Sequence, residues 1–198
     1  MATVLYVKAT PTPETSRSVR IADAFIETYK QHHPEDEIIT LDLYKEGIRF
    51  LTVEDLQLLR HDAAKDPNHP VLKYTYQFLN ADKYVFATPF WNLSIPAILK
   101  AYLDYVCFAG ITFKYTENGP VGLCTGKVVN IAARGGVYSQ GFLADWEMGD
   151  RYLRTILGFL GLTDFQTIAA EGLDIIGADV EGIVSEAIEK AKGLAVRF

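Results

Sequence analysis

Hydrophobic and polar positions follow two patterns along the chain. Short continuous runs of β-branched and aromatic residues are typical of buried strands, whereas apolar residues at every third or fourth position are typical of amphipathic helices. Five runs predict strands, at residues 4–7, 38–41, 84–87, 128–132 and 165–169. The helical pattern predicts helices from about residue 18, over 71–79, over 96–109, over 152–160 and over 180–191, with a short helix around 55–60.

Strands and helices therefore alternate. Strands that are apolar throughout are buried on both faces, as in a parallel sheet that helices cover on each side. The predicted fold class is α/β, a three-layer sandwich around a five-stranded parallel sheet. Ligands of such sheets bind beyond the carboxyl ends of the strands, where the strand order reverses. The loops after the first, third and fourth strands are thus the candidates for a site.

Composition narrows the class of protein. A chain of 198 residues matches one domain of roughly 100–200 residues, so we expect a single domain over 1–198. The net charge of −6 argues against nucleic acid or an anionic membrane as partner. The most apolar stretch, residues 95–111, contains Lys100 and Asp104 and is too short to span a bilayer. The first residues lack a basic start and a cleavage site, so we expect a soluble cytoplasmic protein.

The sequence does not match the common motifs for phosphate binding, dinucleotide binding or catalysis by side chains. Residues 122–127 are one residue short of a phosphate-binding loop, and Val128 stands where that motif needs serine or threonine. No GxGxxG pattern follows the first strand, so a dinucleotide fingerprint is missing. Neither a metal-ligand cluster nor an acid/base pair emerges from the spacing, and we expect no metal. The chemistry is therefore expected to belong to a cofactor.

The first candidate loop enters a helix with hydroxyl groups and one arginine. Thr10, Ser16, Arg17 and Ser18 supply donors at a helix N-terminus, which favours a phosphate group. The alternative is that Ser16 or Ser18 only caps the helix.

The other two loops suit a flat polar ring. Aromatic side chains and an amide occupy the second loop, at Pro89, Phe90, Trp91, Asn92 and Leu93. Its alternative is an aromatic plug over the end of the sheet. In the third loop, residues 133–136, adjacent glycines let the backbone approach a ligand closely, and the alternative is a simple turn. A phosphate group in one loop and a flat ring in the other two match flavin mononucleotide (FMN).

Longer motifs resemble a known family. The segments PFWNLSIPA at 89–97, LKAYLD at 99–104, GITFKYTENGPVGL at 110–123 and RGGVYS at 134–139 are similar to those of the FMN-dependent NADH azoreductases, also called FMN-dependent NADH:quinone oxidoreductases. The similarity covers essentially the whole chain. It implies a flavodoxin-like fold, a homodimer, FMN as cofactor and NADH or NADPH as electron donor. Ala133 departs from the family, because some members have serine there, and the segment 50–70 is short.

The resemblance also implies roles for the residues of the three loops. Thr10, Ser16, Arg17 and Ser18 would hold the phosphate end. Phe90, Trp91, Asn92 and Leu93 would line the isoalloxazine ring. Ala133, Arg134, Gly135 and Gly136 would hold its pyrimidine edge, with N–H groups of the two glycines stabilising negative charge on the reduced ring.

The expected activity is reduction of quinones and aromatic azo compounds. NADH or NADPH would give a hydride to FMN, which carries the chemistry, so no side chain is catalytic. Because no second nucleotide motif is present, donor and acceptor would use the same ring face in turn, in a ping-pong cycle. The alternative is a flavodoxin-type electron carrier for a protein partner. Such a carrier benefits from acidic residues around the flavin, whereas these loops contain Arg17, Trp91 and Arg134, which favours an enzyme.

Two further expectations concern the surface. The helix over 96–109 is apolar around nearly its whole circumference, which predicts a homodimer. Residues 112–123, with a turn at Asn118-Gly119, predict a β-hairpin that lies over the flavin. Phe113, Tyr115 and Phe159 would then shape the acceptor pocket, within one chain or across the dimer.

Overall fold

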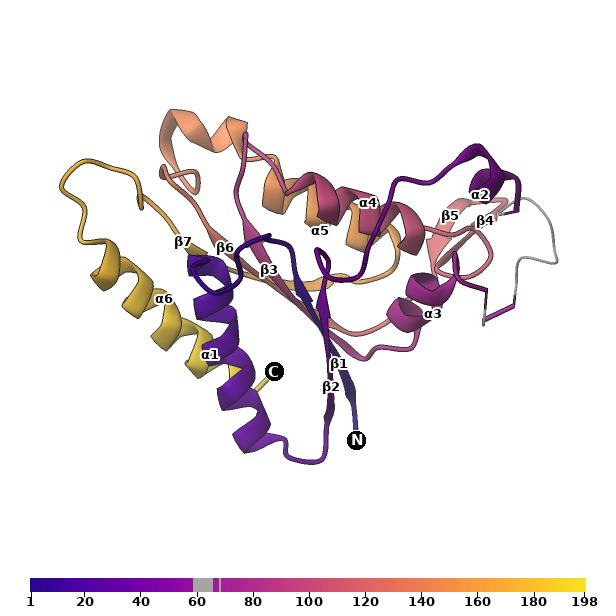
Figure 1. The fold of residues 1–198 in the computed structure, drawn as a ribbon, viewed down its shortest axis with the longest axis horizontal. Coiled ribbons are helices and arrows are strands. Elements are labelled where there is room, and N and C mark those ends of the chain that lie inside the picture. The colour runs from indigo at the N-terminus through magenta and orange to yellow at the C-terminus, as the bar shows by residue number, and fades with distance from the viewer. Residues whose placement is uncertain (59–65, 68) are drawn as a thin grey trace.

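Five parallel strands form the central sheet of the computed structural model, which describes residues 1–58, 66–67 and 69–198 (Figure 1). All neighbouring strands in this sheet pair in parallel. In spatial order they are β2 (Glu37–Asp42), β1 (Thr3–Lys8), β3 (Lys83–Pro89), β6 (Lys127–Ala133) and β7 (Asp164–Ala170). Each strand contains the apolar run that predicted it, so the five-stranded parallel sheet is confirmed.

Helices cover both faces of the sheet, which confirms the three layers (Figure 1). On one face lie α1 (Arg17–His32) and α6 (Val180–Ala195). On the other lie α3 (Lys73–Leu79), α4 (Ala97–Val106) and α5 (Gly149–Phe159). Successive residues of β1 serve the two faces, because side chains alternate along a strand. Val4 and Tyr6 belong to the core beneath α1 and α6, whereas Leu5 and Val7 belong to the opposite core.

The strand order reverses beside β1. The chain passes from β1 to its neighbour β2 and then returns to β3 on the other side of β1. The loops that leave β1 and β3 therefore run in opposite directions, and a crevice opens between them at the carboxyl ends of the strands. This geometry positions the candidate site.

The helix that follows Pro96 ends earlier than the sequence predicts. It stops at Val106 instead of Ala109, and Pro96 is the residue before its first turn. The Thr112 hydroxyl donates to the Val106 carbonyl (2.7 Å) and accepts from the Phe108 N–H (2.9 Å). Because Thr112 satisfies these backbone groups, the chain can leave the helix at this point.

The apolar surface of α4 is covered by its own chain. Tyr102, Leu103 and Val106 are buried in the core that they share with α3 and α5, and the Thr75 hydroxyl of α3 donates to the Tyr105 carbonyl (2.6 Å). The inference that this helix requires a second chain was therefore wrong.

A two-stranded hairpin follows α4, as predicted. β4 (Phe113–Thr116) and β5 (Gly119–Gly122) pair antiparallel. The turn lies one residue earlier than predicted, at Glu117-Asn118, because Gly119 already pairs with Thr116. The hairpin contacts the end of α5 so closely that a Cβ on Gly122 would lie 2.1 Å from the Gly161 nitrogen.

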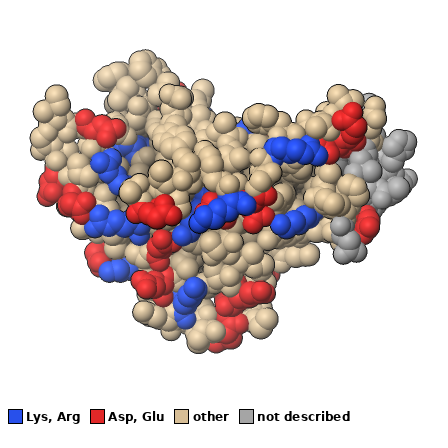
Figure 2. Space-filling model, viewed as in Figure 1, with Lys and Arg blue, Asp and Glu red and all other residues tan. Residues whose placement is uncertain are grey.

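Two short elements complete the description. The short helix predicted around 55–60 is α2 (Val53–Leu58), and its predicted last residues lie outside the described part. A 3₁₀ helix, η2 (Gly141–Trp146), precedes α5. Acidic and basic side chains intersperse on the face that Figure 2 shows. Within the described ranges, every helix is too short or too polar to cross a membrane.

Candidate functional site

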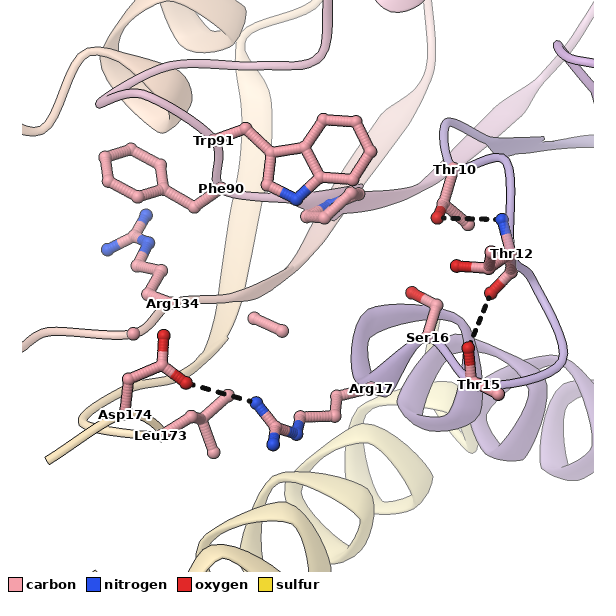
Figure 3. A pocket seen from close by; sticks show the side chains of 13 residues that line it. Thr10, Thr12, Thr15, Ser16, Arg17, Phe90, Trp91, Arg134, Leu173 and Asp174 are labelled. Carbon is pink, nitrogen blue, oxygen red and sulfur yellow. Dashed lines mark hydrogen bonds and ion pairs between the residues drawn. The ribbon is translucent and has the colours of Figure 1, made fainter. Parts of the chain in front are cut away.

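A cavity of about 300 Å³ opens at the carboxyl ends of the strands (Figure 3). This volume lies at the lower end of the range for ligand pockets, about 300–1,000 Å³. The loops after β1, β3, β6 and β7 each contribute to its lining. The lining residues are Thr10, Thr12, Thr15, Ser16, Arg17, Pro89, Phe90, Trp91, Ala133, Arg134, Gly135, Leu173 and Asp174.

The N-terminus of α1 forms one end of this cavity. Ser16 is the N-cap residue, and its hydroxyl accepts from the Val19 N–H at 3.5 Å. The N–H groups of the first turn have no acceptor within a helix, so those of Arg17 and Ser18 can donate to an anion. Ser16 therefore caps the helix, which was the alternative considered above, and it also lines the cavity. Ser18 is fully buried behind Ser16, with the two hydroxyls 3.0 Å apart.

The loop after β3 supplies an aromatic wall. Trp91 and Ser94 exchange two backbone hydrogen bonds of 3.0 Å, which closes a tight turn. Its central residues, Asn92 and Leu93, have φ of 49° and 68°, and a leucine there costs about 1–2 kcal/mol. The turn places Phe90 and Trp91 along the cavity, whereas Asn92 and Leu93 lie outside the lining. Strain retained beside a cavity is typical of a functional site.

The loop after β6 is fixed by pairing with the loop after β7. The N–H groups of Gly172, Leu173 and Asp174 donate to the carbonyls of Gly136, Arg134 and Gly135 at 3.1, 3.2 and 2.9 Å. A Cβ added to Gly135 would lie 2.3 Å from Oδ2 of Asp174, so a larger residue here would displace this carboxylate. The backbone of Gly135 therefore forms part of the cavity wall. Gly136 lies outside the lining, beside the Tyr138 ring.

Arg134 is a buried cation held by two carboxylates. It is 4% exposed, and its Nη2 and Nη1 lie 3.2 Å from Glu147 and 2.9 Å from Glu171. Its guanidinium also lies over the Phe90 ring, 5.6 Å from the ring centre. Within the described part of the chain, its Nε has no hydrogen-bond partner. Arg134 thus joins the aromatic wall to the glycine loop and retains one unpartnered donor beside the cavity.

The two carboxylates are themselves anchored to backbone. Glu147 accepts from the N–H groups of Gly149, Asp150 and Arg151, at 2.8–3.1 Å, and so caps α5. Glu171 accepts from the N–H groups of Tyr138 and Ser139. Burial raises the pKa of Glu171, but the bonds from Ser139, Arg134 and Tyr138 outweigh it and hold this pKa below its usual value. We call Arg134, Glu147 and Glu171 the arginine clamp.

The structure brings together most of the predicted site, with exceptions. Ser18, Asn92, Leu93 and Gly136 support the cavity without lining it. The aromatic residues predicted for the acceptor pocket do lie together, since the Phe113 ring is 5.5 Å from Tyr115 and 4.6 Å from Phe159. They do not line the cavity of their own chain.

Several lining residues were missed. Thr12 and Thr15 belong to the first loop but were not singled out, and Leu173 and Asp174 follow β7. The sequence could have indicated Leu173 and Asp174, because they follow the fifth strand, and all strands of a parallel sheet end at the same edge.

The cavity fits FMN by the chemistry of its donors. A helix N-terminus suits the phosphate group. The aromatic wall, the glycine backbone and the unpartnered Arg134 Nε suit a flat ring with polar edges. The cysteines offer no competing nucleophile, because burial raises the pKa of Cys107 to about 11 and of Cys124 to about 12, so both thiols are protonated at neutral pH. Among the described residues, no three His, Cys, Asp or Glu side chains gather as metal ligands.

Comparison with known proteins gives the same assignment. Residues 2–194 match a protein family described as having a flavodoxin-like fold. The chain is 62% identical over 200 residues to the "FMN-dependent NADH:quinone oxidoreductase 2" of Clostridium acetobutylicum, and 57% identical over 203 residues to the "FMN-dependent NADH:quinone oxidoreductase" of Caldicellulosiruptor saccharolyticus. Both alignments cover 100% of this chain and of the relative.

Solved structures agree. An azoreductase from Bacillus anthracis strain Sterne superimposes with a TM-score of 0.91 and 41% identity, covering 100% of both chains. An FMN-dependent NADH-azoreductase from Bacillus anthracis strain Ames Ancestor, solved in complex with FMN, superimposes with a TM-score of 0.90 and 27% identity. That match covers 100% of this chain and 99% of the other.

Proposed function

This chain belongs to the family with the flavodoxin-like fold, and we propose that it is an FMN-dependent NAD(P)H oxidoreductase that reduces quinones and aromatic azo compounds. Relatives of the same length are FMN-dependent NADH:quinone oxidoreductases and azoreductases by name. The proposal assigns the activity to one domain over residues 1–198.

One observation carries the proposal. A helix N-terminus suited to phosphate, an aromatic wall and a glycine backbone line a single cavity at the switch point of the sheet (Figure 3). A ligand that fills all three parts carries a phosphate group at one end and a flat ring at the other, as FMN does.

Each part of the chain has its own task in this proposal. Ser16 and the N–H groups of Arg17 and Ser18 hold the phosphate group, with the Thr10 side chain beside them. Phe90 and Trp91 flank the ring, which Pro89 and Ala133 border, and Asn92 and Leu93 hold the tight turn that positions Trp91. When bound, FMN supplies the hydride-transfer chemistry.

The glycine loop provides the electrostatics. N–H groups of Gly135 and Gly136 stabilise negative charge at the polar edge of the ring, in the way of preorganised donors elsewhere. The arginine clamp keeps these groups in place, so they need no rearrangement during the reaction. Water supplies the protons of the product.

Donor and acceptor use the same opening of the cavity. Loops around this opening carry no second nucleotide motif, so we infer that NADH or NADPH would give up its hydride and leave as the oxidised nucleotide before the quinone or azo compound enters. Double-reciprocal plots of initial rates at several acceptor concentrations then give parallel lines. Intersecting lines would show that both substrates bind together.

We propose a homodimer on a surface other than α4. Apolar side chains of η2 and of the Trp91 turn are exposed, with Phe142 80% accessible. The Met148 N–H donates to the Leu93 carbonyl (3.0 Å), which joins η2 to the Trp91 turn. Patches of this kind mark interaction sites. The exposed apolar residues of this patch are Trp91, Leu93, Phe142, Trp146 and Met148.

In the dimer, the hairpin of one chain completes the acceptor pocket of the other. Tyr115 is exposed at the side of β4, and with Phe113 and Phe159 it forms an aromatic group suited to planar acceptors. Light scattering at micromolar concentration measures the dimer, and a stable species of monomer mass contradicts it. We place the enzyme in the cytoplasm, since its free cysteines, Cys107 and Cys124, fit a reducing compartment.

The identity of the bound cofactor tests the proposal. Protein purified without added cofactor is expected to be yellow, with a flavin absorption spectrum. Heating releases the chromophore, and chromatography against FMN, FAD and riboflavin standards identifies it. FMN supports the proposal. FAD, or a colourless protein that binds no added FMN, contradicts it.

A further inference from the structure

Asp174 places a carboxylate in the lining of the cavity, below Arg134 and facing Arg17 in Figure 3. Its Oδ1 lies 3.5 Å from Nη1 of Arg17. Its backbone N–H donates to the Gly135 carbonyl at 2.9 Å, and its Oδ2 occupies the space that a Cβ on Gly135 would need. The backbone pairing therefore fixes the base of this side chain beside Arg17.

The position of Asp174 matters because of the positive charges that line the cavity. The lining includes two cations, Arg17 and Arg134, and Arg134 is already paired with Glu147 and Glu171. Arg17 is the remaining cation of the lining, at the helix N-terminus that suits a phosphate group. Asp174 is the ion-pair partner of this cation.

A phosphate group at this helix must share Arg17 with a carboxylate. A carboxylate and a phosphate group beside the same guanidinium repel each other, and an arginine that turns from the carboxylate to the phosphate group gives up one ion pair to form another. We propose that Asp174 is an affinity-determining residue that competes with the phosphate group of FMN for Arg17. The inference rests on the proposed function. It predicts that the chain binds FMN less tightly than its other contacts allow, so the cofactor exchanges more readily.

The variant Asp174→Asn tests this competition. Asparagine keeps the shape and removes the charge, and the side chain is 75% exposed, so the fold is retained. The Kd for FMN of the apoprotein, from quenching of flavin fluorescence, is expected to fall about fivefold, as for loss of one surface charge interaction of about 1 kcal/mol. Riboflavin, which lacks the phosphate group, is expected to bind both proteins equally.

Two controls isolate the effect. Glu181→Gln removes a charge from the neighbouring exposed ion pair, in which Glu181 contacts Arg20 at 2.8 Å, outside the cavity lining. The Kd for FMN of this variant is expected to stay within twofold of the original. In an Arg17→Gln background, Asp174→Asn is expected to change the Kd less than in the original chain, because the shared cation is gone. High salt is expected to shrink the gain, since the Debye length falls to about 3 Å at 1 M.

The outcomes separate this inference from the proposed function. Weaker binding of both FMN and riboflavin by Asp174→Asn would show that the carboxylate is a ligand of the flavin, which overturns the inference. Unchanged FMN binding, or equal tightening for riboflavin, also overturns it. If the original chain binds no FMN, the proposed function fails and the inference fails with it.

Discussion

The arginine clamp predicts a large loss of stability when Glu147 is removed. In Glu147→Ala, Arg134 keeps one of its two carboxylates, and three N–H groups at the start of α5 lose their acceptor. Breaking a buried ion pair costs about 3–5 kcal/mol, and loss of a helix cap about 0.5–2 kcal/mol. Because one side chain makes both interactions, the costs overlap, and we expect a loss of about 3–5 kcal/mol. That is a large share of the 5–15 kcal/mol typical of a domain.

Urea unfolding followed by circular dichroism measures this loss from the midpoint and slope. Glu147→Gln keeps an oxygen for the N–H groups and is expected to lose less than Glu147→Ala. The exposed Glu181→Gln removes one partner of a surface pair and is expected to lose less than about 1 kcal/mol. A loss below 1 kcal/mol in Glu147→Ala, with an unchanged slope, would refute the reasoning that the clamp fixes this region.

Four other changes are expected to give measurable results. Ser16→Ala is expected to weaken FMN binding about tenfold by calorimetry, since a bond to a charged group contributes about 1.5–3 kcal/mol; an unchanged Kd contradicts the placement of the phosphate group. Tyr102→Phe is expected to raise the free energy of unfolding by about 1–3 kcal/mol, because the Tyr102 hydroxyl is fully buried without a partner in the described ranges; a loss contradicts this. Leu93→Gly relieves the backbone at φ 68° and is expected to stabilise by about 1 kcal/mol, whereas lower stability points to lost side-chain contacts. The lowered pKa of Glu171 stabilises the fold at pH values above the unfolded pKa of about 4.3, and this stability is lost as the pH falls through the folded pKa. Glu171→Gln is therefore expected to make the free energy of unfolding depend less on pH in the acid range. An unchanged dependence contradicts this.

The sequence predicted the sheet because burial on both faces leaves a strong pattern. The three inner strands, β1, β3 and β6, are buried along almost their whole length, whereas the edge strands β2 and β7 keep shorter apolar runs. Each of the five predicted runs lies inside an observed strand. The loops after β1, β3 and β6 could be singled out for the same reason, since a known strand end locates its loop.

Long-range pairing could not be predicted. Arg134 lies 37 residues from Glu171, and nothing in the local sequence marks either one as a partner of the other. The same holds for Asn130, which accepts from Thr88 (2.7 Å) and donates to Asp150 (3.0 Å) beneath the cavity. Such networks depend on how three or four elements pack, whereas periodicity describes one element at a time.

Local chemistry explains the errors in element ends. The hydroxyl of Thr112 ends α4 from six residues away, so the apolar pattern continues beyond the helix. A helix that is apolar all round can be buried by its own chain or by a second chain, and the sequence pattern does not distinguish the two. The argument for a dimer from α4 failed for this reason.

Turnover without a protein partner tests the central claim most directly. Apoprotein is titrated with FMN in the presence of NADH and a soluble quinone, and NADH oxidation is followed by its absorbance. An enzyme gives sustained oxidation of NADH, one NADH per quinone, with a rate that rises with FMN and levels off at one FMN per chain. A protein that binds FMN at the cavity and yet gives no steady oxidation of NADH, at any quinone concentration, would be an electron carrier and would contradict the account.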